Sequence, residues 1–252
     1  MDFAGKKVLI TGASRGIGYA TAQEFLTLGA RVAVNGRTEQ SVATAIAELG
    51  GGDRLVPAPG SVGTVDGCVS IVKAAIEGLD GLDVLVNNAG VAIDATIEKV
   101  DEAIWDETLD VNLKGTFFCV RAALPALRNS GGAIVNMASV DGLQGSVEGA
   151  VYCASKGGVV NLTRALAMEL APNIRVNCVC PGWVDTDMLR RDYLDLAADP
   201  AAAEREAIEE APLKRVATAE EIAKAVAYLA SHEARFITGV ALPIDGGGSA
   251  GR

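Results

Sequence analysis

The feature that most constrains the fold is a regular alternation of short β-branched runs with longer amphipathic stretches. We predict strands at residues 7–10, 31–34, 55–58, 84–87, 133–137, 175–178 and 240–244. We predict helices at residues 18–28, 39–49, 65–77, 102–127, 152–171 and 219–230. Alternation of this kind is typical of βαβ units. It predicts an α/β fold with a doubly wound parallel sheet of about seven strands and helices on both faces. The ligand site of such a sheet lies beyond the carboxyl ends of its strands.

One segment departs from the alternation. Residues 187–212 mix apolar and acidic side chains, with Pro200 near their middle. Because this segment follows the sixth predicted strand, it would lie over the ligand edge, and we predict a mobile lid at about 187–213. No low-complexity linker divides the 252 residues, so we expect one domain over residues 1–252.

Composition excludes several classes of partner. The chain carries 22 basic against 32 acidic side chains, a net charge of -10, which has the wrong sign for nucleic acids and anionic membranes. Five cysteines have no framework spacing, the amino-terminal MDFAGKKVLI lacks a cleavable apolar segment, and one histidine cannot complete a zinc site. We expect a cytoplasmic protein with reduced thiols, no metal, no nucleic-acid partner and no membrane partner.

A glycine-rich turn, TGASRGIG at residues 11–18, follows the first predicted strand directly and opens a helix. Glycines in this context allow a tight turn and let a diphosphate approach the backbone, while the helix start offers unpaired N–H groups. The spacing is Gly-x-x-x-Gly-x-Gly and differs from the commonest dinucleotide fingerprint. The strand before and the helix after favour a dinucleotide site.

The end of the second predicted strand indicates which dinucleotide is bound. An acidic residue there usually binds the ribose 2′-hydroxyl of NAD, whereas a 2′-phosphate needs a cation. Here that position is Gly36, followed by Arg37, and Arg15 lies in the glycine turn. Two guanidinium groups without a carboxylate favour NADP(H), and NAD(H) remains possible.

Three further features follow predicted strands: the sequence NNAG at 87–90, Ser139, and Pro181-Gly182. Tyr152 and Lys156 lie one helical turn apart on one face. A phenol with a pKa of about 10 is a poor acid or base at neutral pH until a cation stabilises its phenolate. Lys156 would lower that pKa, and Ser139 would position the substrate oxygen.

In this order, TGASRGIG, NNAG, Asn112, Ser139, YCASK and PG resemble the motifs of the short-chain dehydrogenase/reductase family, from Lys6 to Gly247. The resemblance implies a single Rossmann-type dinucleotide-binding and catalytic domain, a nicotinamide cofactor, and hydride transfer between a carbonyl and an alcohol. It also implies that Tyr152 is the acid/base, Lys156 its partner, Ser139 the substrate-orienting hydroxyl, and Asn112 the holder of a relay water.

By the same resemblance and the arginine argument, we expect cofactor contacts from Gly12, Ser14, Arg15, Gly16, Ile17, Gly18, Arg37, Ser61, Val62, Asn88, Ala89, Gly90, Tyr152, Lys156, Pro181, Gly182, Val184 and Thr186. One position departs from the family pattern. Members commonly carry an Asp near the end of the third strand, against the adenine amino group, and Ser61 stands there without a charge. The resemblance further suggests a homotetramer built through the long helices.

The leading interpretation is an NADP(H)-dependent carbonyl reductase or alcohol dehydrogenase acting on a small or medium, largely apolar, free carbonyl or secondary alcohol. The alternative is a 3-oxoacyl-(acyl-carrier-protein) reductase, because that branch carries closely similar motifs. Acyl carriers are acidic, and the lid carries eight acidic side chains against three arginines, so its rim would repel a carrier. A basic patch from Arg121, Arg128 and Arg164 could still dock one.

Two other classes stay open. A non-catalytic nucleotide-binding regulator would keep the glycine turn but would not need Asn112, Ser139, Tyr152 and Lys156 together. An epimerase or dehydratase of the related extended fold usually has a larger carboxyl-terminal region.

Overall fold

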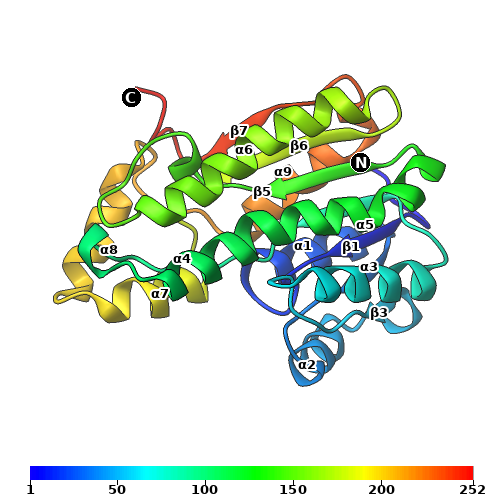
Figure 1. Ribbon diagram of the computed structural model, residues 1–252, viewed down its shortest axis with the longest axis horizontal. Coiled ribbons are helices and arrows are strands. Elements are labelled where there is room, and N and C mark those ends of the chain that lie inside the picture. The colour runs from blue at the N-terminus through cyan, green and yellow to red at the C-terminus, as the bar shows by residue number, and fades with distance from the viewer. Residues whose placement is uncertain (252) are drawn as a thin grey trace.

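The computed structural model describes residues 1–251; Arg252, the last residue of the predicted domain, and the side chain of Asp192 lie outside the described part. Within that part, seven strands form one sheet in the order β3-β2-β1-β4-β5-β6-β7 (Figure 1). The strands are β1 (Lys7–Ile10), β2 (Arg31–Val34), β3 (Leu55–Pro57), β4 (Val84–Asn87), β5 (Ala133–Met137), β6 (Arg175–Pro181) and β7 (Ala241–Ile244). Every neighbouring pair is parallel, and the order reverses between β1 and β4. The predicted doubly wound parallel sheet is confirmed.

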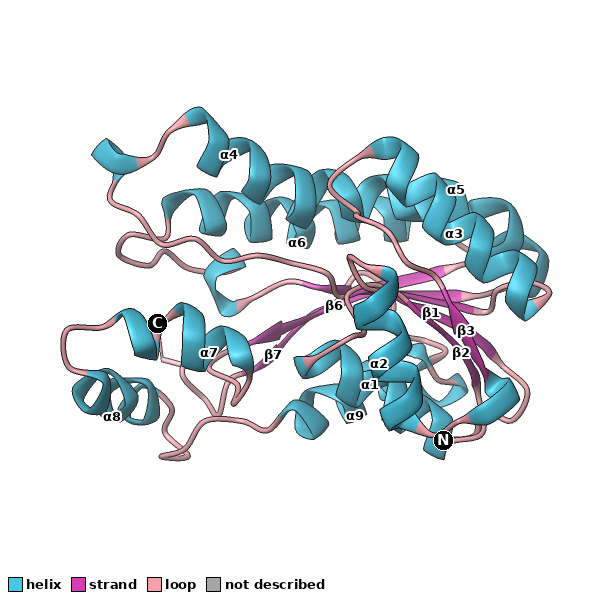
Figure 2. Ribbon diagram, turned by 90° about the horizontal axis from the view of Figure 1, so that it is seen from below, coloured by secondary structure: helices cyan, strands magenta, loops and turns pink. Residues whose placement is uncertain are grey.

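Helices cover both faces of the sheet (Figure 2). They are α1 (Gly16–Thr27), α2 (Glu39–Leu49), α3 (Val65–Leu79), α4 (Glu102–Leu109), α5 (Gly115–Ser130), α6 (Ala150–Leu170), α7 (Asp187–Asp192), α8 (Pro200–Glu210) and α9 (Ala219–Ala230). Figure 2 shows α3, α5 and α6 on one face and α1, α2 and α9 on the other. Along β1, Val8 and Ile10 join the apolar core under α1 and α9, whereas Leu9 joins the core under α3 and α5. Burial on both faces explains why the strands are continuously apolar.

The predicted helix 102–127 was wrong as a single α-helix. The chain forms α4, then a π-helical segment at Asp110–Lys114, and then α5. A π turn adds one residue, which rotates the following side chains relative to those before it. It buries Asn112, whose exposed fraction is 1%. The other predicted helices have the right type, with ends shifted by at most two residues.

Strand β6 is longer than predicted, because it continues past residue 178 to Pro181. The extension pairs with β7, in the register Cys180↔Pro243 and Pro181↔Ile244. Pro181 therefore ends a paired strand, and Gly182 starts the connection to the predicted lid.

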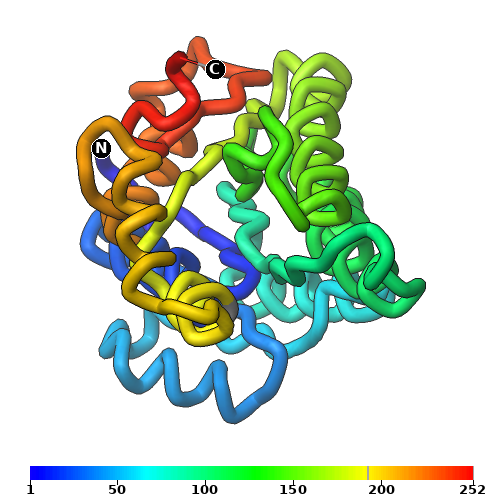
Figure 3. The backbone as a smooth tube through the Cα atoms, turned by 90° about the vertical axis from the view of Figure 1, so that its left-hand side faces the viewer, coloured from blue at the N-terminus to red at the C-terminus, as the bar shows by residue number. Residues whose placement is uncertain are grey.

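That connection leads into two helices, α7 and α8, at the carboxyl edge of the sheet, where Figure 3 shows them in yellow and orange. Leu189, Leu194 and Ala203 form a small apolar cluster, with Trp183 and Tyr193 packed against it. The segment is thus helical and has its own packing, and its closing motion stays a prediction. Within residues 1–251, no helix is long and apolar enough to cross a bilayer.

Candidate active site

The carboxyl ends of β1 and β4 are joined by a compact set of hydrogen bonds. The hydroxyl of Thr11 accepts from the backbone N–H groups of Asn88, at 3.0 Å, and Ala89, at 3.1 Å. The Asn88 amide donates to the carbonyls of Thr11, at 2.9 Å, and Gly12, at 3.1 Å. The glycine turn and the NNAG segment therefore form one rigid junction.

Glycine is required at three positions of the turn. Gly12 and Gly16 have φ angles of +64° and +55°, in the left-handed region that favours glycine. A Cβ atom at Gly18 would lie 2.2 Å from the carbonyl oxygen of Gly12, and one at Gly12 would lie 2.8 Å from the Cα of Ala89. Such close packing brings the start of α1 against the strand end, with the N–H groups near Gly16 free of helical partners. The cradle fits a diphosphate.

Asn35, which the sequence analysis did not single out, fixes the turn from below. Its side-chain oxygen accepts from the N–H of Gly12 at 3.0 Å, and its amide donates to the carbonyls of Ala58, at 2.8 Å, and Gly60, at 3.1 Å. The residue is 2% exposed and follows β2 directly. A buried polar residue after an apolar strand was the available signal, because such a side chain must find partners.

The remaining expected cofactor residues follow the ends of β2, β3, β4 and β6. Arg37 is exposed next to Gly36, and the Ser61 hydroxyl accepts from the N–H of Gly63 at 3.2 Å. Val62 is buried, Asn88, Ala89 and Gly90 leave β4, and Pro181 and Gly182 leave β6, ahead of Val184 and Thr186. Because all the strands are parallel, these segments share one edge of the sheet. Their contacts with a cofactor stay predictions.

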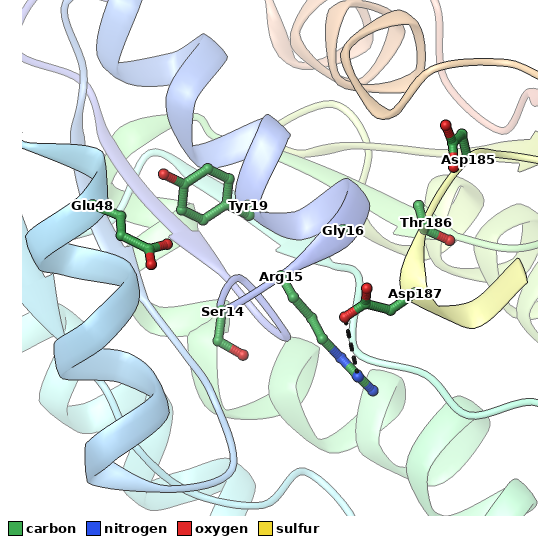
Figure 4. A pocket seen from close by; sticks show the side chains of 8 residues that line it. All are labelled: Ser14, Arg15, Gly16, Tyr19, Glu48, Asp185, Thr186 and Asp187. Atoms are coloured by element: carbon green, nitrogen blue, oxygen red, sulfur yellow. Dashed lines mark ion pairs between the residues drawn. The ribbon is translucent and has the colours of Figure 1, made fainter. Parts of the chain in front are cut away.

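An open pocket of about 370 Å³ lies between the glycine turn and the start of α7 (Figure 4). It is lined by Ser14, Arg15, Gly16, Tyr19, Glu48, Asp185, Thr186 and Asp187. Arg15 points toward Asp187, and the two side chains form an ion pair of 3.6 Å. The pocket joins a predicted cofactor segment to the lid.

Helix α6 places Tyr152 and Lys156 on one face, next to Ser139 at the end of β5. The Lys156 ammonium donates to the carbonyl of Met137 at 2.9 Å and lies 5.6 Å from the centre of the Tyr152 ring. Burial lowers the pKa of Lys156 to about 8. Lys156 therefore titrates much closer to neutrality than an exposed lysine.

The phenol of Tyr152 has a strongly raised pKa. Burial is the main cause, the Ser139 hydroxyl acts against it, and the carboxylates of Asp141 and Asp94 raise the pKa further. Without ligands, the side chain is therefore a protonated phenol at neutral pH. That is the form that can donate a proton to a carbonyl oxygen.

Asn112 uses its whole side chain to hold neighbouring segments. Its oxygen accepts from the N–H of Val91 at 2.8 Å, and its amide donates to the Val91 carbonyl at 2.9 Å and the Ser155 hydroxyl at 3.0 Å. Its carbonyl accepts from the Thr116 hydroxyl at 2.8 Å. The side-chain oxygen and the backbone carbonyl oxygen of Asn112 each have a second lone pair, and the relay water stays a prediction. Ser155, which the sequence analysis missed, links this cluster to the Tyr152 carbonyl at 2.8 Å.

The region around Tyr152 is acidic and aromatic. Desolvation and Glu148 raise the pKa of Asp94, while desolvation, Asp94 and Glu210 raise the pKa of Asp141. The indole of Trp183 donates to Glu210 at 2.7 Å and lies 4.5 Å from the Tyr193 ring, centre to centre. None of these four carboxylates forms an ion pair with a basic side chain in the described part of the chain. We call Asp94, Asp141, Glu148 and Glu210 the acidic mouth; three of them lie outside the segment whose charge the sequence analysis weighed.

A doubly wound sheet with a phosphate-type cradle at one strand end and a half-buried tyrosine above a buried lysine at another defines a dinucleotide-dependent oxidoreductase. The comparisons with known proteins agree with this class. The chain matches the family described as enoyl-(acyl carrier protein) reductase over residues 12–249. It belongs to the short-chain dehydrogenases/reductases, a family of oxidoreductases that act on CH–OH and C=O groups and use a nicotinamide cofactor.

Similar curated proteins include nodulation protein G of Rhizobium sp. strain N33, 39% identical over 249 residues, which are 98% of each chain. The 3-oxoacyl-(acyl-carrier-protein) reductase FabG of Staphylococcus epidermidis is 37% identical over 96% of this chain and 98% of its own. Among solved structures, a candidate short-chain alcohol dehydrogenase from Sinorhizobium meliloti 1021 has a TM-score of 0.92 and 40% identity, covering 99% of this chain and 98% of that chain. A short-chain dehydrogenase/reductase titled glucose/ribitol dehydrogenase, from Brucella melitensis, has a TM-score of 0.91 and 33% identity, covering 98% and 99%.

The acidic mouth generates a prediction about pH. If Tyr152 is the acid/base, as the family resemblance implies, alcohol oxidation requires its base form, and kcat/KM should rise with pH through the pKa of Tyr152. Because the Asp141 carboxylate raises that pKa, Asp141→Asn should move the rising limb to lower pH, and Asp94→Asn should move it less. Asp195→Asn, which removes an exposed lid charge, is the control. A limb that moves to higher pH in Asp141→Asn would contradict the assignment.

Proposed function

We propose that the protein transfers a hydride between NADP(H) and a small or medium, largely apolar, free carbonyl or secondary alcohol, with Tyr152 as acid/base. The observation that carries the proposal is the buried Lys156 beneath the Tyr152 ring, with Ser139 beside the phenol. Because a non-catalytic nucleotide binder would not need a buried, partly desolvated lysine there, this pair favours an enzyme.

The residues divide the chemistry between them. The nicotinamide cofactor, when bound, supplies the hydride to the carbonyl carbon. Tyr152 gives its proton to the carbonyl oxygen, which the Ser139 hydroxyl holds in place by a hydrogen bond. The phenolate that remains is stabilised by the Lys156 ammonium, and Met137 fixes that ammonium from below. A water at the Asn112 carbonyl would return the proton from solvent.

The preference for NADP(H) rests on Arg15 and Arg37. Both side chains are exposed at the edge where the strands end, and Gly36 puts no carboxylate between them. Guanidinium groups bind phosphate through paired, charge-assisted hydrogen bonds.

The proposal of a free substrate rests on charge. An acidic carrier approaching Tyr152 would meet the acidic mouth, whose carboxylates lack ion-pair partners in the described part of the chain. Of the three arginines that could form a docking patch, Arg128 lies in the last turn of α5, just before β5 begins. Within one chain, that position is at the amino ends of the strands, opposite to the catalytic edge.

A 3-oxoacyl-(acyl-carrier-protein) reductase is the second candidate. It is favoured by relatives of that name, such as FabG of Thermotoga maritima, which is 36% identical over 98% of this chain and 99% of its own. The same chemistry at Tyr152 would serve either substrate, so only the region outside the catalytic residues separates the two candidates.

A homotetramer and a cytoplasmic location stay predictions. The exposed Trp105 on α4, Phe117 on α5 and Met168 on α6 support association through these helices, since large apolar side chains on a surface favour burial. All five cysteines are free in the structure, as reduced thiols would be.

The acid/base assignment is tested by Tyr152→Phe, which removes only the hydroxyl. Turnover should fall by about 100-fold or more, the usual effect of losing a general acid, while the cofactor still binds. Lys156→Ala should reduce both turnover and cofactor binding. Tyr228→Phe, on the outer surface of α9, is the matched control. If Tyr152→Phe keeps a tenth or more of the wild-type kcat/KM, Tyr152 is not the acid/base.

The cofactor preference is tested by kcat/KM with NADPH and NADH, which we expect to be higher for NADPH. An acid at position 36 is a poor test, because its Cβ would lie 2.9 Å from the Ser41 hydroxyl and 3.1 Å from Ser14 and Val42 atoms. Arg37→Ala avoids this crowding. It should weaken the binding of NADPH by roughly 10- to 100-fold, the contribution of one charge-assisted hydrogen bond to phosphate. Arg128→Ala, at an exposed position, is the control and should leave kcat/KM unchanged with both cofactors. A wild type that prefers NADH would refute the proposal.

The substrate class is tested with one acyl group on two carriers. We expect kcat/KM for acetoacetyl attached to an acyl carrier protein to be no higher than for its N-acetylcysteamine thioester or small free ketones. Repulsion by the acidic mouth is the reason, so raising the salt concentration should help only the carrier-linked substrate. Turnover that is tenfold or more faster on the carrier would establish the second candidate instead.

A further inference from the structure

An ion pair joins the glycine turn to the lid. The guanidinium of Arg15 lies 3.6 Å from the carboxylate of Asp187, the first residue of α7. Figure 4 shows the two side chains pointing toward one another at the pocket described above. About half of each side chain is exposed, 57% for Arg15 and 51% for Asp187, so solvent and ligands can reach both.

The two members of this pair differ in how strongly they are held. Asp187 has a second and closer partner, Arg191, at 2.7 Å on the next turn of α7. For Arg15, Asp187 is the one carboxylate partner found in the described part of the chain. A phosphate that approaches Arg15 would therefore compete with one long contact and leave Asp187 paired within its helix.

Asp185 provides an internal comparison. It lies on the other side of Thr186 in Figure 4, and its carboxylate receives two hydrogen bonds from Arg190, at 2.8 and 2.9 Å. Asp185 and Asp187 are thus both exposed acids at the same pocket, but the ion pair with Arg15 belongs to Asp187 alone.

We propose that Asp187 sets the selectivity of the cofactor site by competing with the cofactor's 2′-phosphate for Arg15. This inference rests on the proposed use of NADP(H). Asp187 partly neutralises the guanidinium that a 2′-phosphate needs. By linkage, a phosphate bound to Arg15 weakens the ion pair between α7 and the glycine turn by the same free energy by which Asp187 weakens phosphate binding. Asp187 is a specificity-determining residue rather than a catalytic one.

The test measures binding without turnover. Adenosine 2′,5′-bisphosphate and 5′-AMP differ only by the 2′-phosphate, so the ratio of their dissociation constants isolates that group. Isothermal titration calorimetry would compare the wild type with Asp187→Asn, Asp187→Glu, Asp185→Asn, Arg15→Ala and Arg15→Ala/Asp187→Asn. We expect Asp187→Asn to bind the bisphosphate about threefold more tightly than the wild type, the scale of an exposed ion pair, with 5′-AMP unchanged.

The controls separate competition for Arg15 from a general loss of charge. Asp185→Asn removes the same charge from the same pocket and should leave the ratio unchanged, and Asp187→Glu should keep the wild-type ratio. In the Arg15→Ala background, Asp187→Asn should leave the ratio of dissociation constants unchanged, because the ion-pair partner of Asp187 in the glycine turn is then absent.

The inference is overturned if Asp187→Asn leaves the ratio unchanged, if Asp185→Asn changes it equally, or if the effect persists without Arg15. The proposed cofactor preference is judged separately, from the wild-type ratio alone. If the wild type binds the bisphosphate more tightly and Asp187→Asn has the same ratio, the inference about Asp187 is refuted and the proposed preference for NADP(H) is kept. Equal binding of both ligands by the wild type and by Asp187→Asn removes both.

Discussion

The site depends on the hydrogen-bonded junction between the carboxyl ends of β1 and β4. Thr11 and Asn88 exchange four hydrogen bonds with each other's segments, and Asn35 adds three from β2 and the end of β3. Each buried polar group here would cost on the order of 1–3 kcal/mol if it lost its partner, so the arrangement is strongly favoured over any other. The turn glycines can then pack very closely, since a Cβ atom at Gly18 would lie only 2.2 Å from the carbonyl oxygen of Gly12. The cofactor edge is thus fixed before any ligand arrives.

The part of the site around Tyr152 and Lys156 depends on burial and on the charges of the neighbouring side chains. Among the described side chains, Lys156 is the one buried charged group, whereas the carboxylates of Asp141 and Asp94 act on the phenol of Tyr152. The carboxylates raise the pKa of Tyr152, which keeps the proton in place for reduction at neutral pH. The pKa of Lys156, about 8, places the loss of its ammonium charge just above neutrality. Because the carboxylates raise the pKa of Tyr152, the proposed oxidation of an alcohol, which needs the phenolate, is favoured by higher pH.

The sequence predicted the sheet well, because parallel strands buried on both faces leave short β-branched runs that stand out. It also predicted the glycine turn, Ser139, Tyr152 and Lys156 as members of one edge. It could not predict the π segment at Asp110–Lys114, since an extra residue in a helical turn leaves no mark in the apolar spacing. That turn is stabilised by the contacts of Asn112 with Val91 and Ser155, which are 21 and 43 residues away in the chain.

Three members of the acidic mouth, Asp94, Asp141 and Glu148, were missed for a similar reason: they come from segments outside the lid, and only the fold brings them together with Glu210. The lid connects this region with the cofactor edge. Through α7 it contacts Arg15 of the glycine turn, and through Glu210 of α8 it contacts Trp183 beside the substrate region. Exposed ion pairs and indole–carboxylate hydrogen bonds can be changed singly without disturbing the junction, whose groups are buried or half-buried and mutually satisfied. Cofactor and substrate selectivity can therefore vary in the lid, on top of a catalytic edge that tolerates little change.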